Sequence, residues 1–142
     1  MENFDWMNPF NEKFKALLAE YKPSTKDVEQ QKFAEAVVKC VEHLERQLAI
    51  DKAKANEPEE ILETFFETYR AMFEDVVTKE AIETRIEICG SAPAAVFEVF
   101  EELARPLDSA EEKYLRIKAN DIRGVGASIA EYILGVRRPL RN

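Results

Sequence analysis

Two glycines near the carboxyl end have a spacing that could do chemistry. Gly124 and Gly126 are half of the chain's four glycines and are separated by one residue. Glycine tolerates a positive φ and lets the backbone approach another group closely, so Gly-x-Gly before the run from Ala127 to Ala130 predicts a tight turn that opens a helix. The first N–H groups of such a helix have no partner inside it and can hold an anion. The sequence therefore predicts phosphate binding by backbone amides.

The residues around these glycines extend the pattern. Residues 122–130, Ile-Arg-Gly-Val-Gly-Ala-Ser-Ile-Ala, resemble the helix-hairpin-helix motif of DNA-binding and DNA-repair proteins. The resemblance implies a first helix over 109–119, a hairpin over 120–126 and a second helix over 127–134. Its hairpin amides would contact the phosphates of double-stranded DNA without reading the base sequence. The residues implied at this nucleic-acid contact are Lys118, Arg123, Gly124, Val125, Gly126 and Ser128, with Arg137, Arg138 and Arg141 adding positive charge.

A second resemblance concerns the same end of the chain. Residues 109–142 are similar to the end of the amino-terminal lyase domain of family X DNA polymerases, where such a motif closes a small helical domain. Lysines in and beside the second helix of that family form a Schiff base. The corresponding helix here, residues 127–133, contains no lysine. The resemblance therefore implies DNA contact without lyase activity.

The same stretch also fits a kinked amphipathic helix. Apolar residues between Ile122 and Val136 recur at helical spacing, and Gly126 and Ala130 are small enough to let another helix approach. The phosphate site requires exposed amides around Val125, whereas the helix would bury them. The sequence leaves both interpretations open.

Charge is distributed unevenly along the chain. The formal net charge is −8, but residues 109–142 contain seven basic and four acidic residues, so this end carries +3 and residues 1–108 carry −11. An acidic body does not favour phosphate, and the basic end is where a nucleic-acid contact is expected. Alternatively, the basic residues pair with the acidic body or lie near helix C-termini.

Other reactive residues give weaker signals. Cys40 and His43 have the Cys-x-x-His spacing of half a zinc site, but His43 is the only histidine and Cys89 has no such neighbour. We expect no metal and no cofactor. A single histidine, with no Gly-x-Ser-x-Gly or Walker sequence, also leaves few groups for catalysis, and we expect a non-enzyme. The many glutamates are expected to form a solvated surface.

Helices must position these residues. Apolar residues recur at threes and fours, and no run alternates long enough to form a strand. We expect an all-α fold, a five- or six-helix bundle ending in the helix-hairpin-helix. The apolar face over residues 61–77 is the widest, so this helix is expected at the centre of the core. The residues expected to cap helices are Ser24 or Thr25, Asn56, Thr78, Ser91 and Asp108.

The chain is expected to form a single domain over residues 1–142. It would comprise an N-terminal arm (1–8), an acidic helical body (9–107), the helix-hairpin-helix (108–136) and a basic tail (137–142). Phe4 and Trp6 in the arm either pack on the protein's own core or anchor the arm in a partner's groove. No apolar run is long enough for a membrane span or a signal peptide, so a cytoplasmic protein with reduced thiols is expected.

The function expected from these patterns is that of a small non-enzymatic helical protein. It would make non-specific contacts with the nucleic-acid backbone through its C-terminal end. The alternative is an acidic helical bundle that self-associates or docks a protein partner, without binding nucleic acid.

Overall fold

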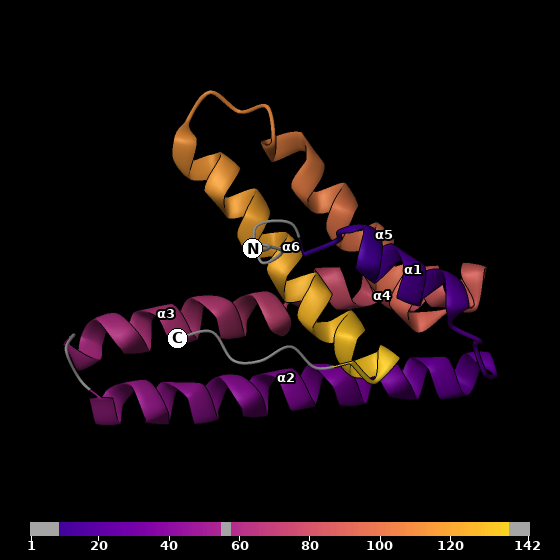
Figure 1. The fold of residues 1–142 in the computed structure, drawn as a ribbon, viewed down its shortest axis with the longest axis horizontal. Helices are drawn as coiled ribbons and strands as arrows, with labels where there is room; N and C mark the ends of the chain where they lie inside the picture. Colours follow the sequence, from indigo (N-terminus) through magenta and orange to yellow (C-terminus); the bar gives the residue numbers. More distant parts are fainter. Residues whose placement is uncertain (1–8, 55–57, 137–142) are drawn as a thin grey trace.

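The computed structural model describes residues 9–54 and 58–136. Helices account for nearly all of this part, which contains no strand, and the prediction of an all-α bundle is confirmed (Figure 1). The elements in order are α1 (Glu12–Glu20), α2 (Lys26–Lys54), α3 (Glu59–Phe73), α4 (Val76–Cys89), α5 (Ala92–Ala104), the short 3-10 helix η2 (Arg105–Leu107) and α6 (Lys113–Leu134).

Polar side chains at the helix ends explain most of these boundaries. The side chain of Ser91 accepts a hydrogen bond from the amide of Ala94 and begins α5, as predicted. The hydroxyl of Thr25 accepts one from the amide of Val28 in the first turn of α2. At the other end of α4, Gly90 has a φ of 78°, the left-handed conformation that favours glycine after a helix.

Two predicted helix starts are wrong. Asp75 rather than Thr78 caps α4, because the Asp75 carboxylate accepts a hydrogen bond from the Thr78 amide at 2.9 Å. Val76 and Val77 consequently open α4 instead of extending α3. Asp108 begins no helix either, since α6 starts at Lys113 after Glu112. The predicted cap Asn56 lies outside the described residues, and Pro58 precedes α3.

The core is centred on α5 rather than on the helix predicted there. Seven residues of α5 are buried, and this helix packs against both α4 and α6. In contrast, α3 buries only Phe66 and Phe73, while Ile61 is 44% and Phe65 58% exposed. The apolar face of α3 is wider than the area that α2 covers, so part of this face is exposed. Its width does not mean that other helices surround α3.

A buried carboxylate joins three segments of the core. Glu29 of α2 has no exposed surface. It accepts hydrogen bonds from the amide of Ala92 at 2.8 Å, the amide of Ser24 at 2.9 Å and the hydroxyl of Tyr21 at 2.9 Å. These bonds connect the start of α5 and the α1–α2 connection to α2. Because every donor points at the charged form, the buried charge is compensated.

The helices form two pairs that diverge from the common core. In Figure 1, α3 runs back along the second half of α2, and the first half of α6 lies beside the end of α5. The second half of α6 returns to the core and crosses α2. We refer to the two projecting pairs as the α2–α3 arm and the α5–α6 arm.

Candidate functional site

The predicted phosphate site is absent because no hairpin forms. α6 is one continuous helix from Lys113 to Leu134 and contains both Gly124 and Gly126. Among the described residues, only Gly90 and Gly135 have a positive φ. Val125 is 2% exposed, and amides inside a helix donate to the carbonyl four residues earlier. The amides around Val125 therefore cannot hold a phosphate, and the amphipathic-helix interpretation is correct.

Close helix packing explains the small residues of the motif. A Cβ atom built on Gly126 would lie 2.7 Å from both Cβ and Cγ of Phe100 in α5. Ala130, one turn further along, is completely buried. The hydroxyl of Ser128 donates to the Gly124 carbonyl at 3.0 Å, within α6 itself. These residues allow α5 and α6 to approach each other.

The basic residues that were predicted to bind phosphate do not converge on one site. The Arg123 guanidinium donates to both carboxylate oxygens of Asp108, at 2.7 and 2.8 Å, and to both of Glu101, at 2.9 Å. These two carboxylates raise the pKa of Arg123 above its ordinary value. Arg123 thus ties α6 to α5 and to the turn after η2. Lys118 is exposed on α6. Other predicted residues lie outside the described residues: Phe4, Trp6, Arg137, Arg138 and Arg141.

Helices α3 and α6 contact each other at the point where the two arms diverge. The hydroxyl of Tyr69 in α3 donates to Asp121 Oδ1 in α6 at 3.1 Å. This bond identifies which side of each helix faces the other. Residues three, four and seven positions away along a helix lie on the same side. The helical strips that continue from Tyr69 and Asp121 toward the arm tips therefore form the walls of the space between the arms.

On α6, the strip that continues from Asp121 carries Lys118, Ile117 and Tyr114. Tyr114 is 69% and Ile117 is 50% exposed, which is unusual for two large apolar side chains on neighbouring turns. Lys118 directly follows Ile117 in the sequence and adds one positive charge. This wall is therefore apolar with a cationic position.

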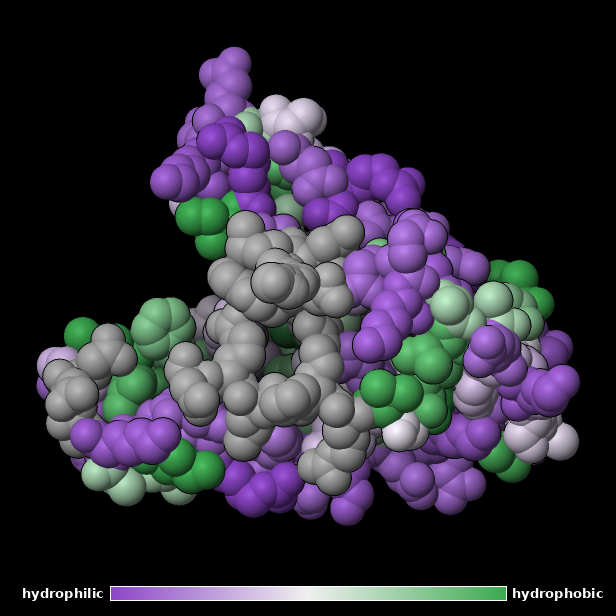
Figure 2. Space-filling model, viewed as in Figure 1, coloured by the Kyte–Doolittle hydropathy of each residue, from purple (hydrophilic) through white to green (hydrophobic). Residues whose placement is uncertain are grey.

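On α3, the strip that continues from Tyr69 carries Phe65 and Ile61, whose exposed fractions were given above. Figure 2 shows a hollow between the two arms, with hydrophobic residues on both sides of it. We call these residues, Ile61 and Phe65 of α3 with Tyr114, Ile117 and Lys118 of α6, the α3–α6 surface.

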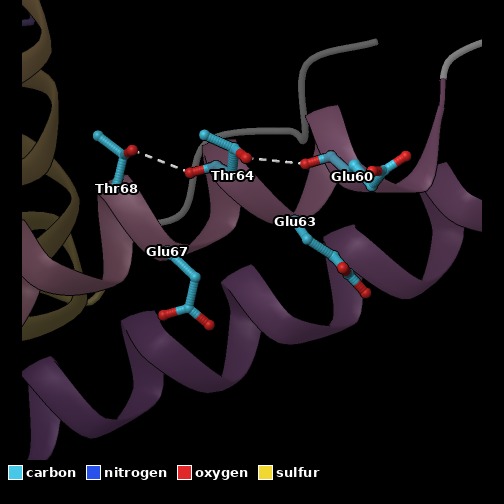
Figure 3. A pocket seen from close by; sticks show the side chains of 5 residues that line it. All are labelled: Glu60, Glu63, Thr64, Glu67 and Thr68. Carbon is cyan, nitrogen blue, oxygen red and sulfur yellow. Dashed lines mark hydrogen bonds between the residues drawn. The ribbon is translucent and has the colours of Figure 1, made fainter.

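The opposite side of α3 is acidic. Glu60, Glu63 and Glu67 line a shallow depression on the helix together with two threonines (Figure 3). The threonine hydroxyls donate to backbone carbonyls one turn earlier, Thr64 to Glu60 at 2.8 Å and Thr68 to Thr64 at 2.9 Å. Glu63 also pairs with Lys52 of α2 at 2.6 Å. These carboxylates lie on the side of α3 that faces away from Phe65, so the α3–α6 surface itself is apolar with one cation, Lys118.

Sequence analysis missed this surface because it assigned the apolar residues of α3 to the core. One signal was available: Phe65 and Phe66 are adjacent, so they point about 100° apart on a helix. A single neighbouring helix cannot cover both. The adjacent aromatic residues therefore indicated that α3 either has two neighbours or exposes one face.

The reactive groups elsewhere do not form a catalytic or metal-binding arrangement in the described ranges. Burial and the nearby Glu131 raise the pKa of the Cys40 thiol to about 12. His43 is half-buried on α2 and interacts with neighbouring groups of the protein. Within residues 9–54 and 58–136, no three potential metal ligands come together. No helix in these ranges is long and apolar enough to cross a membrane.

Comparison with known proteins decides the family. The family model described as PEP-utilising enzyme, N-terminal, matches residues 10–118. The chain belongs to this family. The match extends from the residues before α1 into the first turns of α6 and includes both helices of the α2–α3 arm. No curated protein sequence matches the chain significantly.

This membership overturns the predicted function. A domain of phosphoenolpyruvate-utilising enzymes is not a nucleic-acid-binding module, and the helix-hairpin-helix on which DNA binding depended is a straight helix. The alternative of an interaction domain that docks a protein partner fits the family better.

Proposed function

We propose that this chain is a protein-docking helical domain of a cytoplasmic phosphoenolpyruvate-utilising phosphotransferase, and that its docking site is the α3–α6 surface. The observation that carries the proposal is the exposure of large apolar side chains on both walls of the space between the arms. Aromatic and aliphatic residues clustered in this way commonly provide most of the binding energy of a protein interface. In this proposal, other parts of the enzyme carry out the phosphoryl transfer itself.

Charge indicates the chemistry of the partner. Lys118 is the one charged residue of the α3–α6 surface, and Asp121 lies at its inner end, where it accepts the hydrogen bond from Tyr69. A complementary partner carries an apolar patch with an acidic group opposite Lys118. HPr, the phosphocarrier protein that docks on such domains in phosphotransferase systems, is the partner that we propose.

Titration of the isotope-labelled chain with HPr tests the proposal by NMR. Phe65→Ala and Ile117→Ala should each weaken binding about tenfold, because each removes an exposed apolar contact worth about 1.4 kcal/mol. Neither substitution should change the helical circular dichroism, since both side chains are at least half exposed. Val38→Ala is the matched control, because Val38 is 55% exposed on α2 but lies outside the α3–α6 surface.

The chemical-shift changes should map to α3 and the first half of α6. Binding that is equally strong in Phe65→Ala, Ile117→Ala and Val38→Ala would place the docking site elsewhere. An absence of binding to HPr in the wild-type chain would refute this partner.

A further inference from the structure

The fourth helix has apolar residues on two opposite sides. Ile82 and Ile86 face the core and are 1% and 0% exposed. On the other side, Val77 and Ile88 are each 74% exposed, the highest values among the large hydrophobic residues of the described chain. Packing within the domain explains the first pair and leaves the second unexplained.

These outward residues belong to one stripe. Val77, Ala81, Thr84 and Ile88 follow one another at intervals of four, three and four residues, and all four are exposed. This interval is that of the a and d positions of a coiled coil, which place side chains along the seam between two helices. The small residues Ala81 and Thr84 in the middle allow the backbone of a second helix to come close. We call these four residues the α4 stripe.

Both borders of the α4 stripe are acidic. Glu80 and Glu87 lie on one side, where the amide of Gln30 donates to Glu87 at 3.0 Å. On the other side, Arg85 is held by Glu98 and Glu102 of α5, at 2.9 Å each. Arg85 compensates one of these two carboxylates, and Arg105, which lies near Glu102, also pairs with a third carboxylate, Glu101, at 3.7 Å. The net charge on each side of the stripe is therefore negative.

The charges identify what can cover the stripe. A second copy of the chain would bring acidic borders against acidic borders, and like charges at an interface oppose association. A helix with apolar a and d positions and basic e and g positions would instead complement the stripe and both borders. We propose that the α4 stripe docks a basic amphipathic helix of a partner protein. This site is separate from the α3–α6 surface and does not depend on the function proposed for it.

A synthetic peptide of about three heptads, with Leu at a and d and Lys at e and g, is the probe. Fluorescence anisotropy should show saturable binding, and NMR shifts should map to residues 76–89. The double variant Ala81→Glu/Ile88→Glu separates apolar docking from charge attraction. It makes α4 more acidic, so binding by charge alone would strengthen, whereas docking on the stripe should weaken at least about tenfold.

Two controls complete the experiment. Val38→Glu adds an acidic residue at an exposed apolar position on α2 and should leave the affinity within about twofold of the wild type. A peptide of the same composition but scrambled order should bind at least about tenfold more weakly. Equal or tighter binding by the double variant, or shifts confined to α3 and α6, would overturn the proposal. HPr titration of the same double variant reports on the α3–α6 surface independently.

Discussion

Replacing Gly126 by alanine places a methyl group where α6 crosses α5. The new Cβ would be 2.7 Å from two atoms of Phe100 that are close to its backbone, and Phe100 is only 3% exposed. The ring therefore cannot rotate away, and the helices must separate. Overpacking of this kind costs about 1–3 kcal/mol, while alanine gains about 1 kcal/mol of helix propensity over glycine. A contact of 2.7 Å corresponds to the upper end of this range of overpacking costs, and the gain in helix propensity offsets part of it. We therefore expect Gly126→Ala to lose about 2 kcal/mol of stability.

Gly124 provides the matched control within the same helix. A Cβ atom on Gly124 meets nothing within 4 Å, and its φ is not positive. Gly124→Ala should therefore stabilise the domain by about 0.5–1 kcal/mol. The two substitutions are chemically identical and two residues apart, yet they should have opposite signs.

Thermal denaturation followed by circular dichroism measures both variants. In a domain of this size, 1 kcal/mol corresponds to a change in Tm of about 4 °C, so the two variants should differ by about 10 °C. A hairpin with glycines at positive φ would make both substitutions destabilising. Loss of stability in Gly124→Ala would therefore refute the continuous helix, and a neutral Gly126→Ala would refute the close contact with Phe100.

Two further predictions concern buried groups. Burial raises the pKa of Glu29, but the amides of Ala92 and Ser24 and the Tyr21 hydroxyl outweigh it and hold that pKa below its ordinary value of 4.5. Since this pKa is lower in the folded state, the stability gained from the carboxylate exists above pH 4.5 and is lost as the pH falls further. Glu29→Gln should therefore be about 3 kcal/mol less stable than the wild type at neutral pH. A difference in stability that did not shrink in acid would contradict this prediction. For the thiols, a maleimide should modify the exposed Cys89 in the native protein and the buried Cys40 only after unfolding. Mass spectrometry measures both modifications. Fast modification of both cysteines in the native protein would contradict the burial of Cys40 in the core.

Helix content could be predicted from the sequence because periodicity is a local property. The start of α2 after Thr25 and the Ser91 cap depend on neighbouring residues, and both were predicted correctly. The arrangement of Gly126 and Ala130 was ambiguous, because small residues are needed both for a phosphate-binding turn and for close helix packing. Only Phe100, which is distant in the sequence, decides between them.

The docking surface could not be predicted for a related reason. An apolar residue on a helix indicates that the side chain contacts something, but not whether the contact belongs to the same chain. Ile61 and Phe65 have the same spacing as core residues, and only the path of α2 shows that they are uncovered. Of the basic end, Arg123 is paired with Glu101 and Asp108 and so is not available to a nucleic acid.

The continuity of α6 couples two distant parts of the domain. Its 22 residues extend about 33 Å, from the tip of one arm to the crossing with α2. A straight helix resists bending, so a partner that rotates the end near Tyr114 must displace the opposite end as well. Substitutions at the α2 crossing should therefore alter the affinity of a ligand that never touches them.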